Sequence, residues 1–322
     1  RTQPLIPMRT LLKITTSFAL ALVLTAGMAF GQNNATVNQN GGNNGANLIQ
    51  EFQGSDGEND AFIDQDGQGN KVLEYGQRGS GNLLDIVQNG DFNTVEPYPE
   101  QGDEDAMSYL GETDIDQTGN NNTVWDADQE GYSNYSRVLQ SSNENFVDIE
   151  AQVNPDGGEG TGNTVMITQT TGNGNQVGTP DGNKGFFQYG QSNSATLTQT
   201  GSNNKIGTQS VSGAPYGTNL GVSGQAGGTA GEQSFAQLGE NNTATMTQDG
   251  SGHVVEYALQ DSREGASGNT IISTQSGSMQ TARFSQVGGG NMADLMQSGM
   301  GHDSSIFQYG TGNTATVTQS GN

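Results

Sequence analysis

Glutamine returns every eleven residues in the C-terminal part of this chain, at Gln275, Gln286, Gln297, Gln308 and Gln319. Each of these glutamines closes a segment of one type, seen most clearly in residues 313–319 (NTATVTQ). The general unit is N-x-[A/V/I]-x-φ-x-Q-x-G-x-x, in which φ is an apolar residue. Self-similarity at a fixed period is typical of repeat architectures, and it constrains this fold more than any other feature of the chain.

The composition does not allow a conventional thick apolar core. Only 30% of the 322 residues are hydrophobic and 50 are glycine, which alone is typical of disordered chains. A disordered linker has no reason to keep register, so the periodicity indicates a folded repeat instead. The absence of cysteine excludes disulfides, cysteine-based zinc sites and thiol nucleophiles. The net charge of −24 argues against nucleic acid or an anionic membrane as a partner.

The first 31 residues belong to a different class. A basic stretch over residues 8–13 precedes an apolar run over residues 14–26, and Ala29 and Gly31 stand at −3 and −1 of a cut before Gln32. This pattern predicts a secretory signal peptide over residues 8–31, whereas a membrane anchor needs a longer run of about 20 apolar residues. Residues 1–7 are interpreted as an upstream, non-native extension. We expect residues 32–322 to form a single exported domain.

Segments that end in glutamine, here called arcs, can be followed through the whole mature chain. We count 23 of them, including arcs that end at Gln209 and Gln225. Odd arcs usually open with asparagine and place small or branched apolar residues after it. Even arcs more often place a large apolar residue two positions before the glutamine, namely Tyr75, Phe186, Phe235, Phe284 and Ile306. The full repeat is therefore about 22 residues of strand, turn, strand and turn, with roughly 11.5 rungs.

Alternation along a strand places the asparagine, the apolar residues and the glutamine of each arc on one face. The sequence thus predicts an all-β, flattened two-sheet β-solenoid with cross-β stacking, in which side-chain amides form ladders from rung to rung. Glycines after the glutamines, such as Gly288, Gly299 and Gly310, suit tight corners. The predicted ladder residues are Asn59, Gln65, Asn82, Gln88, Asn163, Gln169, Asn193, Gln199, Asn242, Gln248, Asn269, Gln275, Gln286, Asn291, Gln297, Gln308, Asn313 and Gln319.

These residues resemble the curlin repeat family, whose unit is S-x5-Q-x-G-x-x-N-x-A-x3-Q. Its second half recurs from Gln286 to Gln297 and from Gln308 to Gln319. The resemblance implies a secreted structural subunit of curli, the bacterial functional amyloid, which polymerises into extracellular, cell-surface fibres of the biofilm matrix and serves adhesion. It further implies a nucleator subunit and an outer-membrane secretion channel as partners. Departures from the family pattern include many more repeats, inserted loops over residues 96–111, 153–162, 170–185 and 210–218, and other residues in place of the leading serine.

Both ends of the repeat array are predicted to offer bare strands for head-to-tail addition of further copies. Solenoids normally carry terminal caps, because an uncovered last rung is an open sheet edge. Here the first arc spans Asn33 to Gln39 and the last spans Asn313 to Gln319, without a cap on either. We therefore expect a homopolymer, with no cofactor and no membrane insertion after the signal peptide is cleaved.

Two alternative functions of an extracellular β-solenoid adhesin stay open. The first is calcium binding: 25 of the 34 acidic residues lie between Glu51 and Glu159, and residues 64–70 (DQDGQGN) superficially resemble a calcium loop. A calcium loop of this type needs a glutamate at its twelfth position, but the twelfth position counted from Asp64 is Tyr75. The favoured interpretation is therefore a solvated acidic face that limits lateral association.

The second alternative is ice binding. Outward threonines recur at positions 243/245/247 and 314/316/318, with a related triplet at 194/196/198. Intervening arcs are expected to interrupt this array, because Leu220, Val222 and Gly224 face outward in one of them and Met292, Asp294 and Met296 in another.

Catalysis is not expected. His253 and His302 are the only histidines, and both fall where an asparagine of a turn or ladder is expected. No spacing typical of a catalytic triad occurs, and no metal site is predicted.

Overall fold

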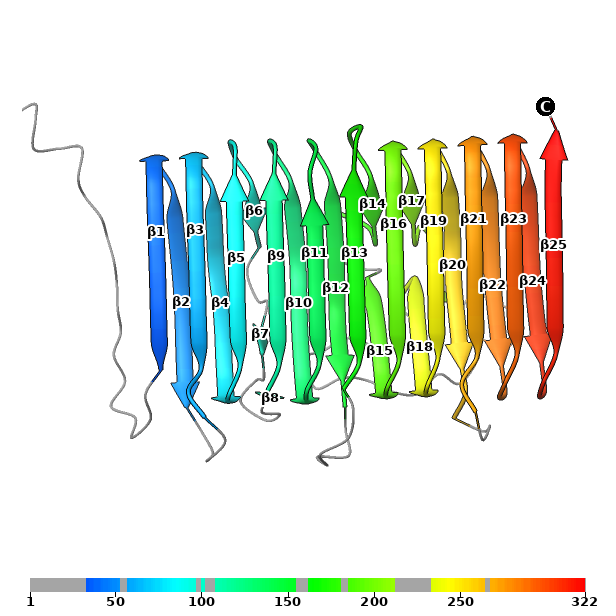
Figure 1. Cartoon of the computed structure of the whole chain (residues 1–322), viewed down its shortest axis with the longest axis horizontal. Helices are drawn as coiled ribbons and strands as arrows, with labels where there is room; N and C mark the ends of the chain where they lie inside the picture. Colours follow the sequence, from blue (N-terminus) through cyan, green and yellow to red (C-terminus); the bar gives the residue numbers. More distant parts are fainter. Residues whose placement is uncertain are drawn as a thin grey trace, which may run out of the picture.

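The computed structural model describes residues 33–52, 57–96, 100–101, 108–154, 162–180, 185–211, 233–263 and 267–321. Over these ranges the chain contains no α-helix, and its parallel strands form two sheets that lie face to face (Figure 1). The predicted all-β solenoid is thereby confirmed. The proposed extension over residues 1–7 and signal peptide over residues 8–31 lie outside the described residues. No described segment is a helix long and apolar enough to span a membrane.

Sheet A contains eleven strands that stack in chain order. Neighbouring strands pair in register, so that glutamine lies beside glutamine at every step, as Gln248 does beside Gln275. The strands are β1 (Asn34–Gly42), β3 (Asp60–Gln68), β5 (Leu83–Asn89), β9 (Glu112–Thr118), β11 (Tyr135–Gln140), β13 (Thr164–Thr170), β16 (Ser194–Ser202), β19 (Thr243–Ser251), β21 (Thr270–Ser278), β23 (Met292–Met300) and β25 (Thr314–Gly321).

Sheet B contains fourteen strands on ten levels, because three of its levels are divided between short strands. Strands β6, β7 and β8 share one level, β14 and β15 a second, and β17 and β18 a third. The strands are β2 (Gly45–Phe52), β4 (Lys71–Ser80), β6 (Thr94–Val95), β7 (Glu100–Gln101), β8 (Ser108–Tyr109), β10 (Thr123–Tyr132), β12 (Phe146–Val153), β14 (Gln176–Val177), β15 (Phe186–Gln191), β17 (Lys205–Ile206), β18 (Phe235–Glu240), β20 (Val254–Asp261), β22 (Thr281–Val287) and β24 (Asp303–Tyr309).

The number of rungs is lower than the sequence pattern suggested. Eleven strands of sheet A and ten levels of sheet B make 21 arcs in the described residues, not 23. Gln199 pairs directly with Gln248, so no rung lies between them. Gln209 lies in an exposed bend, and Gln225 lies outside the described residues. The error has a simple cause: residues 207–233 interrupt one sheet-B level, between β17 and β18, and contain glutamines at spacings that imitate the repeat.

The 22-residue repeat holds only at the C-terminal end. Successive sheet-A glutamines are 22 residues apart from Gln275 to Gln297 and on to Gln319. Earlier turns are longer, with 23 to 49 residues between successive glutamines. The extra residues fall within sheet-B levels or in turns that lead from sheet B back to sheet A. Two of the expected loops are partly strands, since residues 96–111 contain β7 and β8 and residues 170–185 contain β14.

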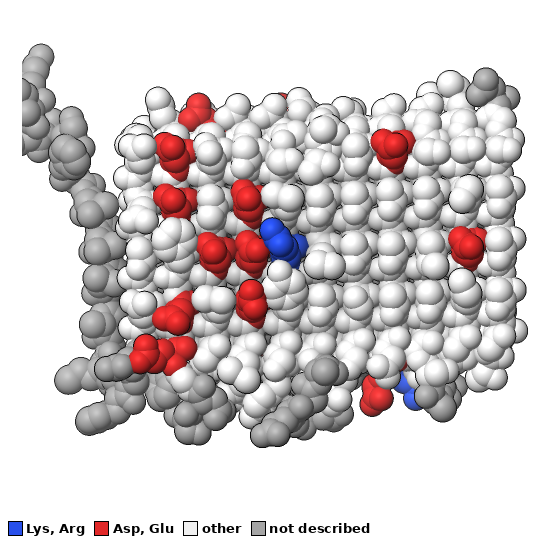
Figure 2. Space-filling view, viewed as in Figure 1, with Lys and Arg blue, Asp and Glu red and all other residues white. Residues whose placement is uncertain are grey.

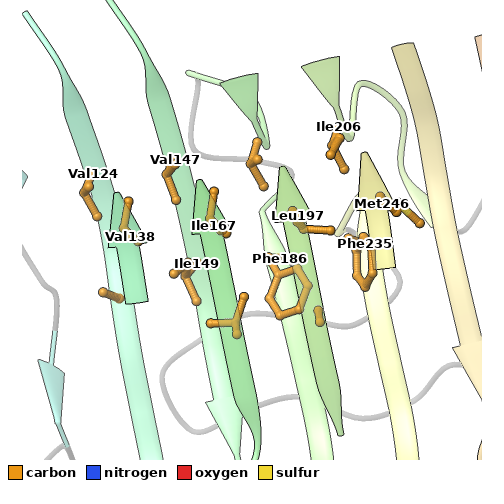
Figure 3. Close-up of a cluster of buried hydrophobic side chains, with 14 of the residues drawn as sticks. Val124, Val138, Val147, Ile149, Ile167, Phe186, Leu197, Ile206, Phe235 and Met246 are labelled. Atoms are coloured by element: carbon orange, nitrogen blue, oxygen red, sulfur yellow. The ribbon is translucent and has the colours of Figure 1, made fainter. Parts of the chain in front are cut away.

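The main apolar core is a thin layer between the sheets, to which each level contributes one or two side chains (Figure 3). Sheet A contributes branched residues such as Val138, Ile167 and Leu197, and sheet B contributes Val147 and Ile149. The large apolar residues recognised in the even arcs all lie in this layer, at 0–4% exposure: Tyr75, Phe186, Phe235, Phe284 and Ile306. The ring centroids of Phe186 and Phe235 are 4.6 Å apart.

A second, smaller core lies on the other side of sheet B. It gathers Ala151, Phe187, Leu238 and Leu259 from four neighbouring levels, together with Val211 from the interrupting segment. Because alternate residues of a strand face opposite sides, these side chains cannot belong to the layer between the sheets. The outer face of sheet B is therefore partly covered by the chain's own insertion, whereas no described insertion interrupts a strand of sheet A.

Candidate functional site

Two glutamine ladders run along the length of the solenoid. In sheet A, the Nε2 of each glutamine donates to the Oε1 of the next at 2.7–3.0 Å, from Gln39 through to Gln319. In sheet B, the corresponding bonds run at 2.7–3.2 Å from Gln50 to Gln308. The predicted ladder glutamines 65, 88, 169, 199, 248, 275, 286, 297, 308 and 319 all lie in one or other ladder.

The ladder amides also bond across the sandwich. The Nε2 of Gln65 donates to the Gly45 carbonyl of sheet B at 3.1 Å, and that of Gln77 donates to the Asp60 carbonyl of sheet A at 3.1 Å. The second amide hydrogen is therefore satisfied by the opposite strand. Because buried polar groups without partners are costly, this pairing explains how a core so rich in amides can be stable. The sequence pattern did not reveal these cross-sheet bonds.

The asparagines that open the sheet-A strands form a column, and the expected amide-to-amide bonds join neighbouring members at four steps, for example from Asn242 Nδ2 to Asn193 Oδ1 at 3.0 Å. Bonds between these side chains and the backbone, which the sequence pattern did not predict, reinforce the column. The Oδ1 of Asn59 accepts the backbone N–H of Asn82 at 3.0 Å, and the same bond recurs from Asn291 to Asn269 at 3.1 Å. The Nδ2 of Asn291 donates to the turn carbonyl of Gly310 at 2.9 Å. These side chains thus fasten each turn to its neighbours. The same backbone-to-Oδ1 bond joins the other predicted asparagines, 163, 193, 242, 269 and 313, to the level below.

A second asparagine column opens the sheet-B levels. The sequence reasoning noted it only where His253 and His302 replace an asparagine, and did not predict its asparagines as ladder residues. Its members follow the sheet-A glutamines by five or six residues: Asn44, Asn70, Asn93, Asn122, Asn145, Asn175 and Asn204. That spacing was the signal that could have found them. The backbone N–H of His253 donates to Asn204 Oδ1 at 3.1 Å, and the histidine ring contacts the Asp249 carbonyl at 3.2 Å. This ring takes an asparagine's place in the column, and burial lowers its pKa, which favours the neutral form.

The predicted turn glycines have the conformations that such corners need. The φ angles of Gly288, Gly299 and Gly310 are 105°, 111° and 99°, in the left-handed half of conformational space. A Cβ on Gly288 would lie 2.1 Å from the Gly310 carbonyl oxygen, and one on Gly299 would lie 1.7 Å from that of Gly321. A Cβ on Gly310 would meet no atom closer than 3.8 Å. Stacking between levels therefore excludes a side chain at Gly288 and Gly299 but not at Gly310, which no further described level covers.

Acidic side chains gather on the outer face of sheet A over β3, β5 and β9 (Figure 2). Desolvation, followed by the charges of Asp114, Asp116 and Asp64, raises the pKa of Asp85. Arg137 on the next strand lies 3.3 Å from Asp114. Asp64 and Asp66 lie on strand β3 and not in a loop, so the resemblance to a calcium loop does not extend to its conformation. Among the described residues no cluster of three or more potential ligands could hold a metal ion.

Threonine and serine dominate the same face further along the solenoid. One row contains Thr168, Thr198, Thr247 and Thr274 on four neighbouring strands. The sequence placed an arc with outward Leu220, Val222 and Gly224 inside this array. That placement was wrong, because β16 pairs directly with β19; the three residues themselves lie outside the described ranges. The outward residues 292, 294 and 296 of β23 do interrupt the array before β25, as expected.

The outermost described levels are more open than the inner ones. On β25 the inward residues Ala315, Val317 and Gln319 are only half-buried, whereas their equivalents on β23 are fully buried. At the other end Val37 of β1 is half-buried in the same way. Of the residues predicted for polymerisation, Asn33 donates to the Gln50 carbonyl at 3.1 Å and Gln39 to Gln65. Asn313 accepts no bond from a further level of the described structure, but its Nδ2 donates to Asn291 Oδ1 at 2.9 Å.

Comparison with protein families decides what kind of repeat this is. The model of the curlin associated repeat matches residues 288–321, which include β23, β24 and β25. This segment is a curlin repeat. The resemblance drawn from the glutamine spacing is thereby confirmed. The earlier levels show the same glutamine and asparagine contacts, so the geometry of the repeat extends beyond the matched segment. No curated protein shows significant similarity to the chain.

Proposed function

We propose that this chain is the subunit of a curli-type amyloid fibre, which grows by adding copies to the ends of the solenoid. The observation that carries the proposal is the polarity of the two glutamine ladders. Every ladder bond is donated in the same direction, from the N-terminal toward the C-terminal levels. The described strands therefore present acceptors, Gln39 and Gln50, at one end and donors, Gln308 and Gln319, at the other. Stacking one copy on another in the same direction pairs these groups.

Burial of apolar surface would also favour the addition of a copy. The layer between the sheets is half-open at the outermost levels, where Val37, Leu48, Ala315 and Val317 pack against the core without being fully buried. Adding a copy would cover these side chains and pair the free edges of the terminal strands. Uncovered strand edges are templates for such pairing. Stacked, in-register strands with amide ladders are also the structural basis of amyloid stability.

The remaining features of the proposal follow from the curlin repeat and from the N-terminal sequence. A signal peptide over residues 8–31 would direct the chain out of the cell, where a secretion channel of the outer membrane and a nucleator subunit would assist assembly. The fibres would lie on the cell surface and serve attachment and the biofilm matrix. The two histidines occupy the asparagine column in this scheme, which fits a structural role and not a catalytic one.

Fibre diffraction tests the proposal. We expect the purified protein to form fibres with a meridional reflection at about 4.7–4.8 Å, the spacing between neighbouring strands. A variant with Gln39→Ala and Gln50→Ala loses the acceptors at one end only, and it should elongate existing fibres more slowly than the unchanged protein. A protein that stays monomeric at high concentration, or fibres without the reflection, would contradict the proposal.

A second candidate function, ice binding, is favoured by a threonine row that is unbroken over β13, β16, β19 and β21. Thr168, Thr198, Thr247 and Thr274 form a straight, half-exposed row with the spacing of neighbouring strands. Regular hydroxyls and methyl groups on a flat sheet could order surface water. Thermal hysteresis of the monomer in solution, lost on replacing Thr247 with lysine, would support this function. If no thermal hysteresis is measured, the threonines are ordinary strand residues, since threonine is common in β-strands.

A further inference from the structure

The two sheets do not end on the same level. Within the described residues β1 and β25, both in sheet A, are the outermost strands of the solenoid, and sheet B begins with β2 and ends with β24. The chain passes from one level of sheet A through one level of sheet B to the next level of sheet A. Within the described residues, sheet B therefore has no level beside β25 at the C-terminal end.

Two ways of stacking a second copy differ in how they treat this step. If the copy keeps its orientation, β1 lies on β25, and sheet B lacks one level between β24 and the copy's β2. If the copy is rotated by half a turn around the fibre axis, its sheets exchange sides and its strands reverse direction. Strands of sheets A and B run in opposite directions (Figure 1), so the copy's β1 then runs parallel to β24. It fills the missing level, and β2 continues sheet A on β25.

Strand lengths at the ends suit the rotated arrangement. In every sheet-A strand the glutamine follows the first residue by five positions, as in Asn34 to Gln39. Most sheet-B levels are longer, which produces register shifts between β2 and β4 and between β20 and β22. The sheet-B strands nearest the two ends, β2, β22 and β24, have the five-residue spacing of sheet A. A sheet-A strand can therefore stack on β24, and β2 on β25, without a bulge.

Inward side chains also match across the rotated junction. With Gln39 above Gln308, Val37 lies above Ile306 and Ala35 above Ser304. With Gln50 above Gln319, Leu48 lies above Val317, and Ala46 lies above Ala315. Both glutamine ladders cross the junction, each passing from one sheet to the other. The unrotated arrangement extends only the sheet-A ladder and leaves the glutamines of sheet B separated by an empty level, where backbone groups of both strands would lack partners.

We propose that successive copies in the fibre are related by a half-turn around its axis, so that sheet A of one copy continues sheet B of the next. The inference rests on the proposed function and adds the geometry of the contact. Heterologous, head-to-tail contacts of this kind build open filaments. One consequence is that the acidic face over β3, β5 and β9 alternates between opposite sides of the fibre from copy to copy.

Engineered disulfides test the junction, and the chain is suited to them because it contains no cysteine. The outward residue Thr36 lies beside Ser305 in the rotated arrangement and beside Thr316 in the unrotated one. Residues paired on neighbouring strands lie about 4.8 Å apart, within the range that a disulfide spans. We expect oxidised fibres of Thr36→Cys/Ser305→Cys to give covalent multimers on denaturing gels, and fibres of Thr36→Cys/Thr316→Cys to give monomers. The single Thr36→Cys variant controls for random cross-links.

The reverse pattern of cross-links would overturn the half-turn and leave the proposed function intact. Absence of fibres from the unchanged protein would instead overturn the proposed function, and this inference with it. If a cysteine pair blocks fibre growth, the rotation per subunit measured in fibres of the unchanged protein distinguishes the two arrangements. A rotation of about 180° per subunit supports the inference, because each copy must exchange its sheets with the next, and a rotation near zero overturns it.

Discussion

A buried glutamine in this solenoid depends on neighbours at the levels before and after it. Gln248 is fully buried; it accepts a bond from Gln199 and donates to Gln275, at 2.9 Å in each case, and to the Lys205 carbonyl at 3.1 Å. An isolated buried amide would be costly, but here every polar atom is paired. The contribution of one glutamine to the stability of the fold therefore depends on the register of the adjacent levels.

Replacing Gln248 with alanine should test this dependence. The change leaves the Gln199 donor and the Gln275 acceptor without ladder partners inside the core, and each such loss costs about 1–3 kcal/mol. We expect the free energy of unfolding of the monomer to fall by about 3 kcal/mol or more, measured by urea denaturation. Gln209→Ala is the matched control: this glutamine fits the sequence period but lies in an exposed bend, so its loss should cost under about 0.5 kcal/mol. Equal losses of unfolding free energy in the two variants would contradict a stabilising role of the glutamine ladder.

The acidic patch makes stability depend on pH. Desolvation and neighbouring carboxylates raise the pKa of Asp85 above its ordinary value of 3.8. A carboxyl group with a raised pKa in the folded state binds its proton more tightly there than in the unfolded state, so its ionisation destabilises the fold. The free energy of unfolding should rise as the pH falls from neutral through the folded-state pKa toward 3.8.

Urea denaturation at several pH values measures this effect. Asp85→Asn should be more stable than the unchanged protein at neutral pH and should show a weaker dependence between neutral pH and pH 4. Asp294→Asn, an outward aspartate of β23 far from the patch, serves as the control and should keep the original dependence. If Asp85→Asn leaves the pH dependence of the free energy of unfolding unchanged, the prediction is wrong.

At the scale of elements, the turns differ in what they tolerate. The turns from sheet A to sheet B are nearly constant in length, and their glycine corners stack on one another: a Cβ on Gly277 would lie 2.1 Å from the Gly299 carbonyl oxygen. Insertions occur instead inside sheet-B levels, as between β14 and β15. A loop that leaves the stack at both ends costs little, because closure entropy grows slowly with length.

Inserting Gly-Ser-Gly-Ser at two places should separate these classes. After Pro180, within the existing interruption of sheet B, the insertion should lower the free energy of unfolding by less than about 1 kcal/mol. After Ser278, in a turn from sheet A to sheet B, the same four residues would break the corner stack and the column contact of Gln280 with the Ser276 carbonyl. We expect a much larger loss there. Urea denaturation of the two variants, compared with the parent, gives the difference; similar values would show that the turns are equivalent.

The sequence was sufficient to predict the strands but not their number. Alternation and the recurring glutamine identified both sheets, because the repeat is local and each level carries its own evidence. The segment around Gln209 and Gln225 misled the count, since glutamine spacing does not show whether a segment enters the stack or leaves it. Asn204 and the other asparagines of its column were not predicted as ladder residues, although Asn204 follows Gln199 by five residues and the histidines of the same column had been noted. Cross-sheet bonds to backbone carbonyls depend on three-dimensional proximity, and no residue pattern encodes them.

For the whole molecule, the same contacts that hold one level on the next would hold one copy on the next. Inner and outermost corners differ only in whether another level covers them. Gly299 is covered by Gly321, whereas Gly310 has nothing closer than Asn313 at 3.8 Å around its would-be side chain. The difference provides a way to disturb the assembly without disturbing the subunit.

Gly310→Ala should therefore separate folding from fibre growth. In the monomer the alanine must adopt a φ of 99°, which costs about 1–2 kcal/mol, but it meets no close neighbour. In a fibre the next copy would bring its own corner onto this position, and covered corner glycines such as Gly277 and Gly288 leave only 2.1 Å between a Cβ and the carbonyl oxygen of the next level. We expect urea denaturation to show a modest loss, and elongation from preformed seeds, followed by dye binding, to slow at least tenfold. Gly299→Ala is the converse control, because its Cβ would clash with Gly321 inside the subunit and should destabilise the monomer itself. Elongation of Gly310→Ala at the parent rate would show that no corner of the next copy covers Gly310.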